Sequence, residues 1–475
     1  MSEKELYYQN LVIIVTVSKI ASGPLKVHPR NPRYFTDGSG KAVYLTGIHT
    51  WSNLQEYESD SPFNYEAYLD FLQKNNYNFT RLWTWECGLR SEWMHGWSEE
   101  KLLVHPLIYK RTGPGTAFDG KPKFDLTRFN QEFFDRLRER VKAAGDRGIY
   151  VSVMLFQGWD IESKGRITNP WDAHPFNKHN NINGIDGDPK STGIGRIHTL
   201  DVPAITRLQE LYVRKVIDTL NDLDNVLYEI SNESYVESME WQCHMVNYIH
   251  NYEKNKPKQH PVGITVQYSL KGRGVNLGLF NSPADWISPN TPADDGYNYC
   301  YNPPPADGTK IVLLDTDHLW GIGGDSTWVW KAFTRGYNPI FMDPYDSGFM
   351  DPCDTGLINV GIIDSDWDSA RKALGQTRMF ADRMNLVDMI PHPELAHTRY
   401  CLANPNVEYL IYRPPEMTRR IAVDLSKTEG EFLVEWFNPD TGISVEAKSV
   451  TGGKRIVFVA PFNGGAVLYL KHHTP

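Results

Sequence analysis

Two apolar segments of the sequence end in carboxylates, which can serve as general acids, bases or nucleophiles. VLYEISNE (226–233) ends in Asn232 and Glu233, and KIVLLDTD (310–317) ends in Asp315 and Asp317. A carboxyl group that is partly buried, or close to another carboxylate, has a raised pKa and can deliver a proton near neutral pH. A second carboxylate that stays ionised can attack an electrophilic carbon. These two segment ends are therefore the candidates for the catalytic groups.

Polar side chains also stand where other apolar segments stop. They are His49, Arg81, Glu86, Gln157, Gln267 and Asp343. The carboxyl ends of parallel barrel strands meet at one face, where catalytic groups lie. So many polar ends predict one shared pocket rather than unrelated loop starts. Trp83, His318 and Trp320 lie in or just after two of these segments and are further candidates for contact with a substrate.

Strand-like and helical segments alternate along most of the chain. The eight strand-like segments are AVYLTG, YNFTRLWTW, IYVSVMLFQ, NVLYEISNE, PVGITVQY, ADWISPN, KIVLLDTDHLW and NPIFMDPY. This alternation predicts an α/β fold, and eight units predict a (β/α)8 TIM barrel. A doubly wound open sheet is the alternative. DLTRFNQEFFDRLRERVKAAGDRG is predicted as one of the helices, with Asp125 as its N-cap and Gly148 near its end.

Three regions are expected. Residues 1–45 form an N-terminal extension with a β-hairpin around Asp-Gly-Ser-Gly, and residues 46–395 form the catalytic barrel. Residues 396–475 contain short alternating runs between turn signals, which predict a small β-sandwich. In its segment EFLVEWFNP the apolar residues Phe432, Val434 and Trp436 alternate with polar ones, so this face needs a partner sheet. The sandwich is expected to pack on the barrel and to have no catalytic part.

The segment YEISNE resembles the strand-4 signature of the clan A glycoside hydrolases, the (β/α)8 superfamily that includes the family-5 cellulases. The resemblance implies that Glu233 is the general acid/base and that Asn232 binds the sugar beside the scissile bond. NFTRLWTW resembles the family's strand 2, which implies that Arg81 supports the nucleophile. The hairpin and the sandwich resemble a cellulase-like subgroup whose terminal domain is named for collagen binding.

The expected reaction is hydrolysis of glycosidic bonds in a poly- or oligosaccharide by two carboxyl groups, with retention implied by the clan. The sequence departs from the clan at strand 7, where relatives carry a nucleophilic Glu and this chain has Asp315 and Asp317. Two strand residues that are two apart face the same side, so both stay candidates, with Glu86 as a third. Glu229, four residues before Glu233, is expected to be a buried structural carboxylate paired with an arginine.

Parts of the sequence also suit other functions. A carbohydrate- or protein-binding barrel without catalysis is the main alternative, and a lyase or transferase on the same barrel is another. Asp-Thr-Asp (315–317) has the form of a metal-binding Asp-x-Asp, but no nucleotide-binding half accompanies it, and GIGGDS (321–326) lacks the third glycine of a dinucleotide loop. The sequence has no HExxH and no GxSxG.

The composition indicates which classes of molecule the protein can bind. The net charge of −9 argues against nucleic acid and anionic membranes, while the 14 Trp, 25 Tyr and 20 Phe suit a carbohydrate substrate. The five cysteines are scattered and show no metal-ligand spacing, so no metal or cofactor is predicted. The sequence leaves the oligomeric state open.

The apolar run LVIIVTV (11–17) is too short to span a membrane, and Glu3 and Glu5 stand where a signal peptide carries positive charge. A weak secretion signal and an additional strand both stay open, so the protein is expected to be either secreted or cytoplasmic.

Overall fold

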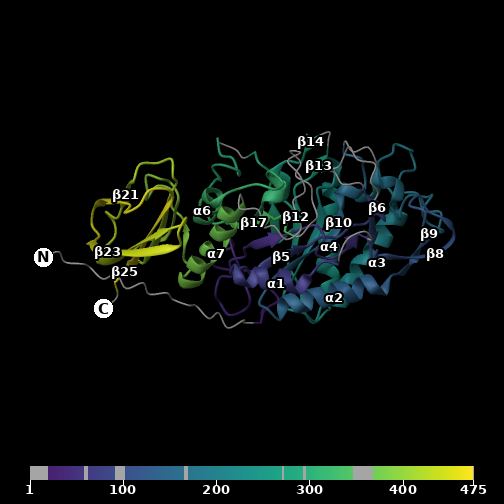
Figure 1. Cartoon of the computed structure of the whole chain (residues 1–475), viewed down its shortest axis with the longest axis horizontal. Coiled ribbons are helices and arrows are strands. Elements are labelled where there is room, and N and C mark those ends of the chain that lie inside the picture. Colours follow the sequence, from purple (N-terminus) through teal and green to yellow (C-terminus); the bar gives the residue numbers. More distant parts are fainter. Residues whose placement is uncertain are drawn as a thin grey trace.

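The computed structural model describes residues 20–57, 62–90, 102–164, 169–269, 272–292, 296–345 and 367–473. Eight parallel strands close into a barrel, in the order β3-β5-β10-β11-β12-β15-β16-β17 (Figure 1). They are β3 (Gly47–His49), β5 (Phe79–Leu82), β10 (Tyr150–Gln157), β11 (Val226–Asn232), β12 (Val262–Thr265), β15 (Trp286–Ser288), β16 (Ile311–Asp315) and β17 (Asn338–Met342). The predicted TIM barrel is confirmed, and the doubly wound sheet is excluded. The run 11–17 lies outside the described residues.

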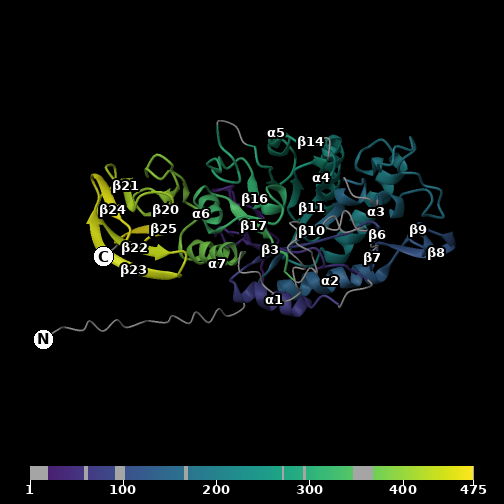
Figure 2. The ribbon, with the colours of Figure 1, turned by 45° about the horizontal axis from the view of Figure 1, so that its top comes forward.

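The helices lie around the barrel (Figure 2). They are α1 (Tyr65–Lys74), α2 (Gln131–Gly145), α3 (Pro203–Leu220), α4 (Met239–Glu253), α5 (Asn276–Phe280), α6 (Ser326–Thr334) and α7 (Asp368–Arg383). Helix α1 shows why they form, because its buried residues Tyr65, Tyr68, Leu69 and Leu72 have the spacing of one helical face. Asn64 caps it by accepting a hydrogen bond from the backbone N–H of Ala67.

The prediction for the start of α2 was wrong. Asp125 lies in β9 (Pro122–Phe129), which pairs with β8 (Tyr109–Thr116), and the helix begins only at Gln131, with Asn130 at its N-cap position. An aspartate before an amphipathic run is an N-cap signal in sequence. Here pairing with β8, which begins more than ten residues upstream, keeps this stretch extended.

The barrel interior has two layers. Phe79, Leu227 and Leu313 pack near the amino ends of their strands, in one cluster with Leu25 and Phe35 from the N-terminal segment. In that segment β1 (Lys26–Val27) pairs with β2 (Phe35–Thr36), and Phe35 also bridges to Val43. The N-terminal hairpin therefore contributes to the apolar core at the amino end of the barrel.

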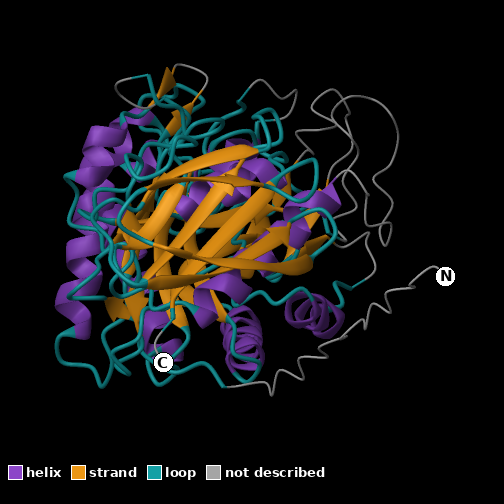
Figure 3. Cartoon of the chain, turned by 90° about the vertical axis from the view of Figure 1, so that its left-hand side faces the viewer, coloured by secondary structure: helices purple, strands orange, loops and turns teal. Residues whose placement is uncertain are grey.

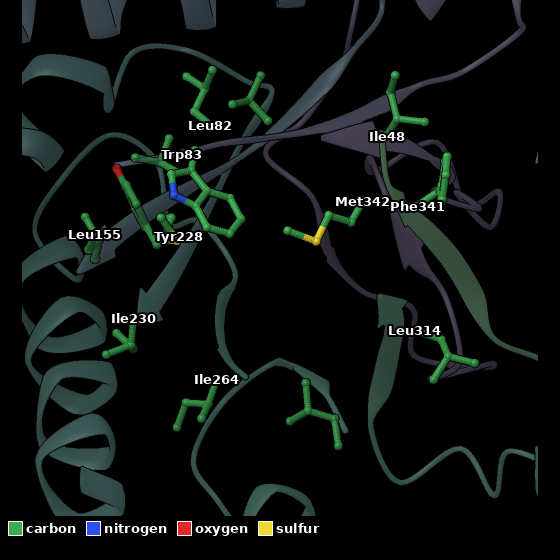
Figure 4. Packing of buried hydrophobic residues seen from close by; sticks show 14 of the residues in the cluster. Ile48, Leu82, Trp83, Leu155, Tyr228, Ile230, Ile264, Leu314, Phe341 and Met342 are labelled. Carbon is green, nitrogen blue, oxygen red and sulfur yellow. The ribbon is translucent and has the colours of Figure 1, made fainter. Parts of the chain in front are cut away.

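Two residues further along the same strands, the inward positions become charged. Successive strand residues face opposite sides, so Arg81, Glu229 and Asp315 follow the apolar layer on the inner face. Their neighbours Leu82, Ile230 and Leu314 belong to the other large cluster, which includes residues of the surrounding helices (Figure 4). Each strand thus contributes to the outer core and presents polar groups inward near its carboxyl end.

The C-terminal domain, which faces the viewer in Figure 3, is built around one antiparallel sheet. Both faces of this sheet make packing contacts. The six strands of this sheet are β18 (Ile390–Pro391), β19 (Cys401–Asn404), β20 (Glu408–Arg413), β25 (Ala466–His472), β22 (Glu431–Asn438) and β23 (Ile443–Thr451). One face, with Phe432, Val434 and Trp436, packs against β21 (Arg420–Asp424) and β24 (Arg455–Val459), as predicted. The collagen-binding role implied by the resemblance stays a prediction.

The other face of the sheet contacts the barrel helices, which confirms that the sandwich packs on the barrel. Trp330 of α6 stacks on Tyr412, with ring centroids 6.1 Å apart. Phe380 of α7 lies 5.3 Å from Phe437 and 6.0 Å from Tyr469, again between ring centroids. Aromatic rings from both domains therefore form a continuous apolar interface.

The described residues between β15 and β16, which are 289–292 and 296–310, contain no helix. A cavity of about 940 Å³ lies beside this connection and is bordered by Tyr297, Tyr299 and Tyr337 among others. It contains none of the candidate catalytic residues. No helix within the described ranges has the length and apolar character needed to cross a membrane.

Candidate active site

Arg81 is the centre of the charged layer. Its guanidinium donates to both oxygens of Glu229 at 2.6 and 2.7 Å, and Nη1 donates to Asp317 Oδ2 at 2.7 Å. Nη2 also donates to Asn232 Oδ1 at 2.7 Å. Burial opposes the charge of Arg81, but the carboxylates of Glu229, Asp317 and Asp315 outweigh it and raise the pKa. The predicted pairing of Glu229 with an arginine is confirmed.

Asp315 and Asp317 have different environments. Asp315 is the last residue of β16, and its Oδ1 lies 2.9 Å from His49 Nε2 and 3.0 Å from the backbone nitrogen of Asp317. Its Oδ2 is 3.7 Å from Arg81 Nη1. Burial favours the neutral form of Asp315, but His49 and Arg81 outweigh it and hold its pKa well below the usual range.

Asp317 lies in the 3-10 turn η5 (Thr316–His318), not on the strand. The expectation that both aspartates follow the strand alternation was therefore wrong, because Asp315 ends the strand by accepting the backbone N–H of Asp317. Asp317 nevertheless faces the same Arg81 and makes the shorter contact with it, 2.7 Å against 3.7 Å for Asp315.

Glu233 directly follows β11 and has a left-handed backbone conformation, with φ +44°. Trp159 Nε1 donates to its Oε2 at 2.5 Å, and Lys164 Nζ donates to its carbonyl oxygen at 2.8 Å. Gly158 approaches the same carbonyl so closely that a Cβ there would lie 2.1 Å from the oxygen. Three residues of the β10 loop therefore fix the position of Glu233.

The pKa of Glu233 is raised to about 7. Burial is the largest cause, because it disfavours the ionised carboxylate, and the charge of Asp317 acts in the same direction. Lys164, the hydrogen bond from Trp159 and Arg81 oppose this increase. A carboxyl group with this pKa can donate a proton and take one back near neutral pH.

Asn232 connects the two sides of the site. Its Oδ1 accepts from Arg81 and lies 3.2 Å from His318 Nε2, and its Nδ2 donates to Gln157 Oε1 at 3.1 Å. Burial lowers the pKa of His318, against the raising effect of Asp317, so the ring is neutral at pH 7. Gln157 Nε2 is buried and has no acceptor within the described residues.

Glu86 lies in a separate buried cluster. Its two oxygens are 3.7 Å from His174 Nε2 and 3.4 Å from His198 Nε2, and Oε2 also accepts the backbone N–H of Gln157. Burial favours its neutral form, but the two histidines outweigh it and lower its pKa to about 2. His174 Nδ1 accepts the backbone N–H of Phe176, so in the neutral ring Nε2 carries the proton toward Glu86.

Four other predicted site residues lie at the edge of this network or outside it. Trp83 stacks on His49, with ring centroids 5.7 Å apart. Asp343 is fully buried and forms a two-fold ion pair with Arg371 of α7, at 2.6 and 2.7 Å. The remaining two are Gln267, which packs against Gly274, and Trp320, which contacts Tyr301 and Trp328. The structure does not bring Asp343, Gln267 or Trp320 into the Arg81 network.

Trp159, Lys164 and His198 were not predicted as site residues. Trp159 comes two residues after Gln157, at the end of a predicted strand, so its position could have identified it. Lys164 and His198 come from the long segment between β10 and α3, where no periodic pattern indicates orientation. The described residues contain no group of three or more His, Cys, Asp or Glu side chains arranged to hold a metal ion.

Comparison of the sequence with protein families gives one partial match. Residues 104–271 match the model of a domain of unknown function, DUF6298. A search of curated proteins finds no match.

Solved structures resemble the whole chain. A glycoside hydrolase of family 5 from Bacteroides vulgatus ATCC 8482 shares 14% sequence identity, with a TM-score of 0.61 over 95% of this chain and 94% of its own. A second chain from that organism, provisionally described as a glycoside hydrolase, shares 12% identity, with a TM-score of 0.62 over 96% of this chain and 83% of its own. The protein therefore has the fold of the family 5 glycoside hydrolases.

Proposed function

We propose that this protein is a glycoside hydrolase that cleaves glycosidic bonds in a poly- or oligosaccharide. Glu233 is the general acid/base and Asp317 is the nucleophile. The observation that supports this most directly is the pairing of unlike carboxyl groups: Glu233 has a pKa of about 7, while Asp317 forms a 2.7 Å ion pair with Arg81. Glycoside hydrolysis needs one carboxyl group of each kind.

In the first step the Asp317 carboxylate forms a bond to the anomeric carbon. The bond from that carbon to the leaving oxygen breaks, and Glu233 gives its proton to this oxygen. In the second step Glu233 takes a proton from water, the water oxygen bonds to the anomeric carbon, and Asp317 is released as a carboxylate. Two displacements at one carbon give net retention of configuration.

Asp317 fits the role of nucleophile better than Asp315. The Asp315 carboxylate already accepts hydrogen bonds from His49 and from the backbone of Asp317. Arg81 donates to both Asp317 and Asn232, and Asn232 is the chain neighbour of Glu233. The charge of Asp317 also raises the pKa of Glu233. A barrel that only binds sugar has no need of a buried carboxyl group with a pKa near 7 beside a second one that pairs with an arginine.

The test is Glu233→Gln, assayed on a panel of aryl glycosides and polysaccharides. The amide keeps the shape of the side chain but cannot transfer the proton, so turnover is expected to fall by about two to four orders of magnitude. Aryl glycosides with very good leaving groups need little protonation, so their first step should suffer less. Glu237→Gln, an exposed carboxylate four residues further on, is the matched control and should behave as the unmodified protein. Full activity of Glu233→Gln would contradict the proposal.

A further inference from the structure

Lys164 is a buried lysine beside Glu233 that the proposed mechanism has not used. It lies in the loop after β10, and its side chain is 1% exposed. Its Nζ donates to the carbonyl oxygens of Glu233 at 2.8 Å and of Tyr268 at 3.0 Å. The same nitrogen lies 3.9 Å from Glu233 Oε2.

Aromatic faces complete the surroundings of this ammonium group. Lys164 Nζ is 4.7 Å from the ring centroid of Trp159 and 5.0 Å from that of Tyr268. Removing an ammonium from water costs several kcal/mol unless close partners offset the loss. Two carbonyls, two rings and a carboxylate supply those partners, and all of them belong to the immediate surroundings of Glu233.

The contact between Lys164 and Glu233 also joins two residues with a left-handed backbone conformation. Glu233 and Lys164 both have φ +44°, a left-handed conformation that costs free energy for a residue with a side chain. Such conformations persist where surrounding contacts hold them. The hydrogen bond from Lys164 joins these two residues and ties the end of β11 to the loop after β10.

The charged groups that act on the Glu233 carboxyl come from three elements. Lys164 approaches from the β10 loop, Asp317 from η5 and Arg81 from β5. Burial and Asp317 favour the protonated form, whereas Lys164 and Arg81 favour the ionised form, and Trp159 stabilises the latter through its hydrogen bond. Arg81 contacts Glu229, Asp317 and Asn232, whereas Lys164 contacts the Glu233 carbonyl and lies 3.9 Å from its carboxyl group.

We infer that Lys164 is a positioning residue for Glu233, which holds its carbonyl and supplies the positive charge that lets the same carboxyl group act as acid and then as base. The inference rests on the proposed function. Without the lysine, burial and Asp317 would keep Glu233 protonated, so it would still serve as the acid. The second step requires the Glu233 carboxylate. Asp317 is then bonded to the sugar and carries no charge, but burial still favours protonated Glu233, so this step would become slow.

The pH dependence of the two steps tests this. An opposite charge at about 4–6 Å lowers a carboxyl pKa by about one to three units, so Lys164→Met should move the pKa of Glu233 upward by about one unit or more. The alkaline limb of kcat/KM for the first step should move to higher pH by the same amount. At pH 7, turnover of activated glycosides that are limited by the second step should fall about five-fold for the first unit, because the ionised fraction of Glu233 falls from about one half to about one eleventh.

Three further variants separate charge from structure. Lys164→Arg keeps the charge and should leave the alkaline limb in place. Lys164→Gln keeps a donor for the carbonyls but removes the charge, so it should shift the limb even if Lys164→Met folds poorly. Lys310→Met removes another lysine that donates to two backbone carbonyls, those of Ser282 and Ala284, and should not shift the limb.

A direct titration makes the test independent of catalysis. The carboxyl 13C signal of Glu233, identified by its absence in Glu233→Gln, is followed against pH by NMR. An upward shift in Lys164→Gln supports the inference even if no glycoside is cleaved, in which case only the proposed function fails. An unchanged titration in both uncharged variants would overturn the inference.

Discussion

At the scale of single residues, one guanidinium organises the acidic site. Arg81 contacts Glu229 on one side and Asp317 and Asn232 on the other, with distances of 2.6–2.7 Å. Arg81 Nη1 lies 2.7 Å from Asp317 Oδ2, so this carboxylate has a buried ion-pair partner. Asp317 lies in the 3-10 turn η5, beyond the end of the strand.

The two aspartates should therefore respond differently to loss of charge. Asp317→Asn is expected to abolish turnover of every glycoside, whatever its leaving group, because it removes the nucleophile. Asp315→Asn should retain measurable turnover, since this carboxylate acts through His49 and the backbone of Asp317.

Steady-state kinetics of the two variants on activated and unactivated aryl glycosides measure this difference in turnover. A 2-deoxy-2-fluoro glycoside with a good leaving group should label Asp317, and mass spectrometry of the digested protein identifies the labelled residue. Label on Asp315 would reverse the assignment.

At the scale of elements, the end of β11 depends on the turn that follows β10. Gly158 begins the 3-10 turn η1 (Gly158–Asp160) and lies against the carbonyl of Glu233. Trp159 of the same turn donates to the Glu233 carboxyl group. Glu233, the proposed general acid/base, is thus placed by a neighbouring element as well as by its own strand.

Gly158→Ala should disturb this arrangement. The added Cβ would lie 2.1 Å from the Glu233 carbonyl oxygen, which is a backbone atom, so β11 and the turn must separate. Overpacking of this kind costs about 1–3 kcal/mol of unfolding free energy, and turnover should fall with it because Glu233 moves. Denaturant unfolding and kcat are the measurements. Gly278→Ala in α5, where the nearest atom is the flexible end of Met239, is the control and should change neither greatly. An unaffected kcat in Gly158→Ala would show that the turn does not position Glu233.

At the scale of the whole molecule, the barrel and the sandwich share an aromatic interface. Trp330 and Phe380 project from α6 and α7 onto Tyr412, Phe437 and Tyr469 of the sheet. The interface lies on the outer surface of the barrel and shares no residue with the Arg81 network. The sandwich should therefore contribute to stability and not to the reaction.

Phe380→Ala tests whether the sandwich contributes to stability and not to the reaction. A fully buried Phe reduced to Ala costs about 3–5 kcal/mol of unfolding free energy, and the variant should unfold at lower denaturant concentration. The kcat of the folded protein should be unchanged. Leu433→Ala on β22, where the side chain is 51% exposed, is the control and should have little effect on stability. A large loss of kcat in folded Phe380→Ala would instead connect the sandwich to catalysis.

The sequence determined the barrel because its signals are local. Each strand-like segment carries its own apolar run and polar end, and eight of them in alternation with helices correspond to one closed sheet. The expected pairing of Glu229 with an arginine is present, and the arginine is Arg81 of β5. Local signals failed at Asp125, because pairing with the preceding strand β8 keeps this residue extended where the pattern predicted the start of a helix.

Only the tertiary structure decided the details of the site. The strand period placed Asp315 and Asp317 on one side, but the hydrogen bond between them ends the strand and turns Asp317 toward Arg81. Lys164 and Trp159 reach Glu233 from a loop about 70 residues away along the chain, a contact that no periodicity encodes. The protonation of Glu233 depends on burial and on charges from three elements, so it exists only when the folded chain brings them together.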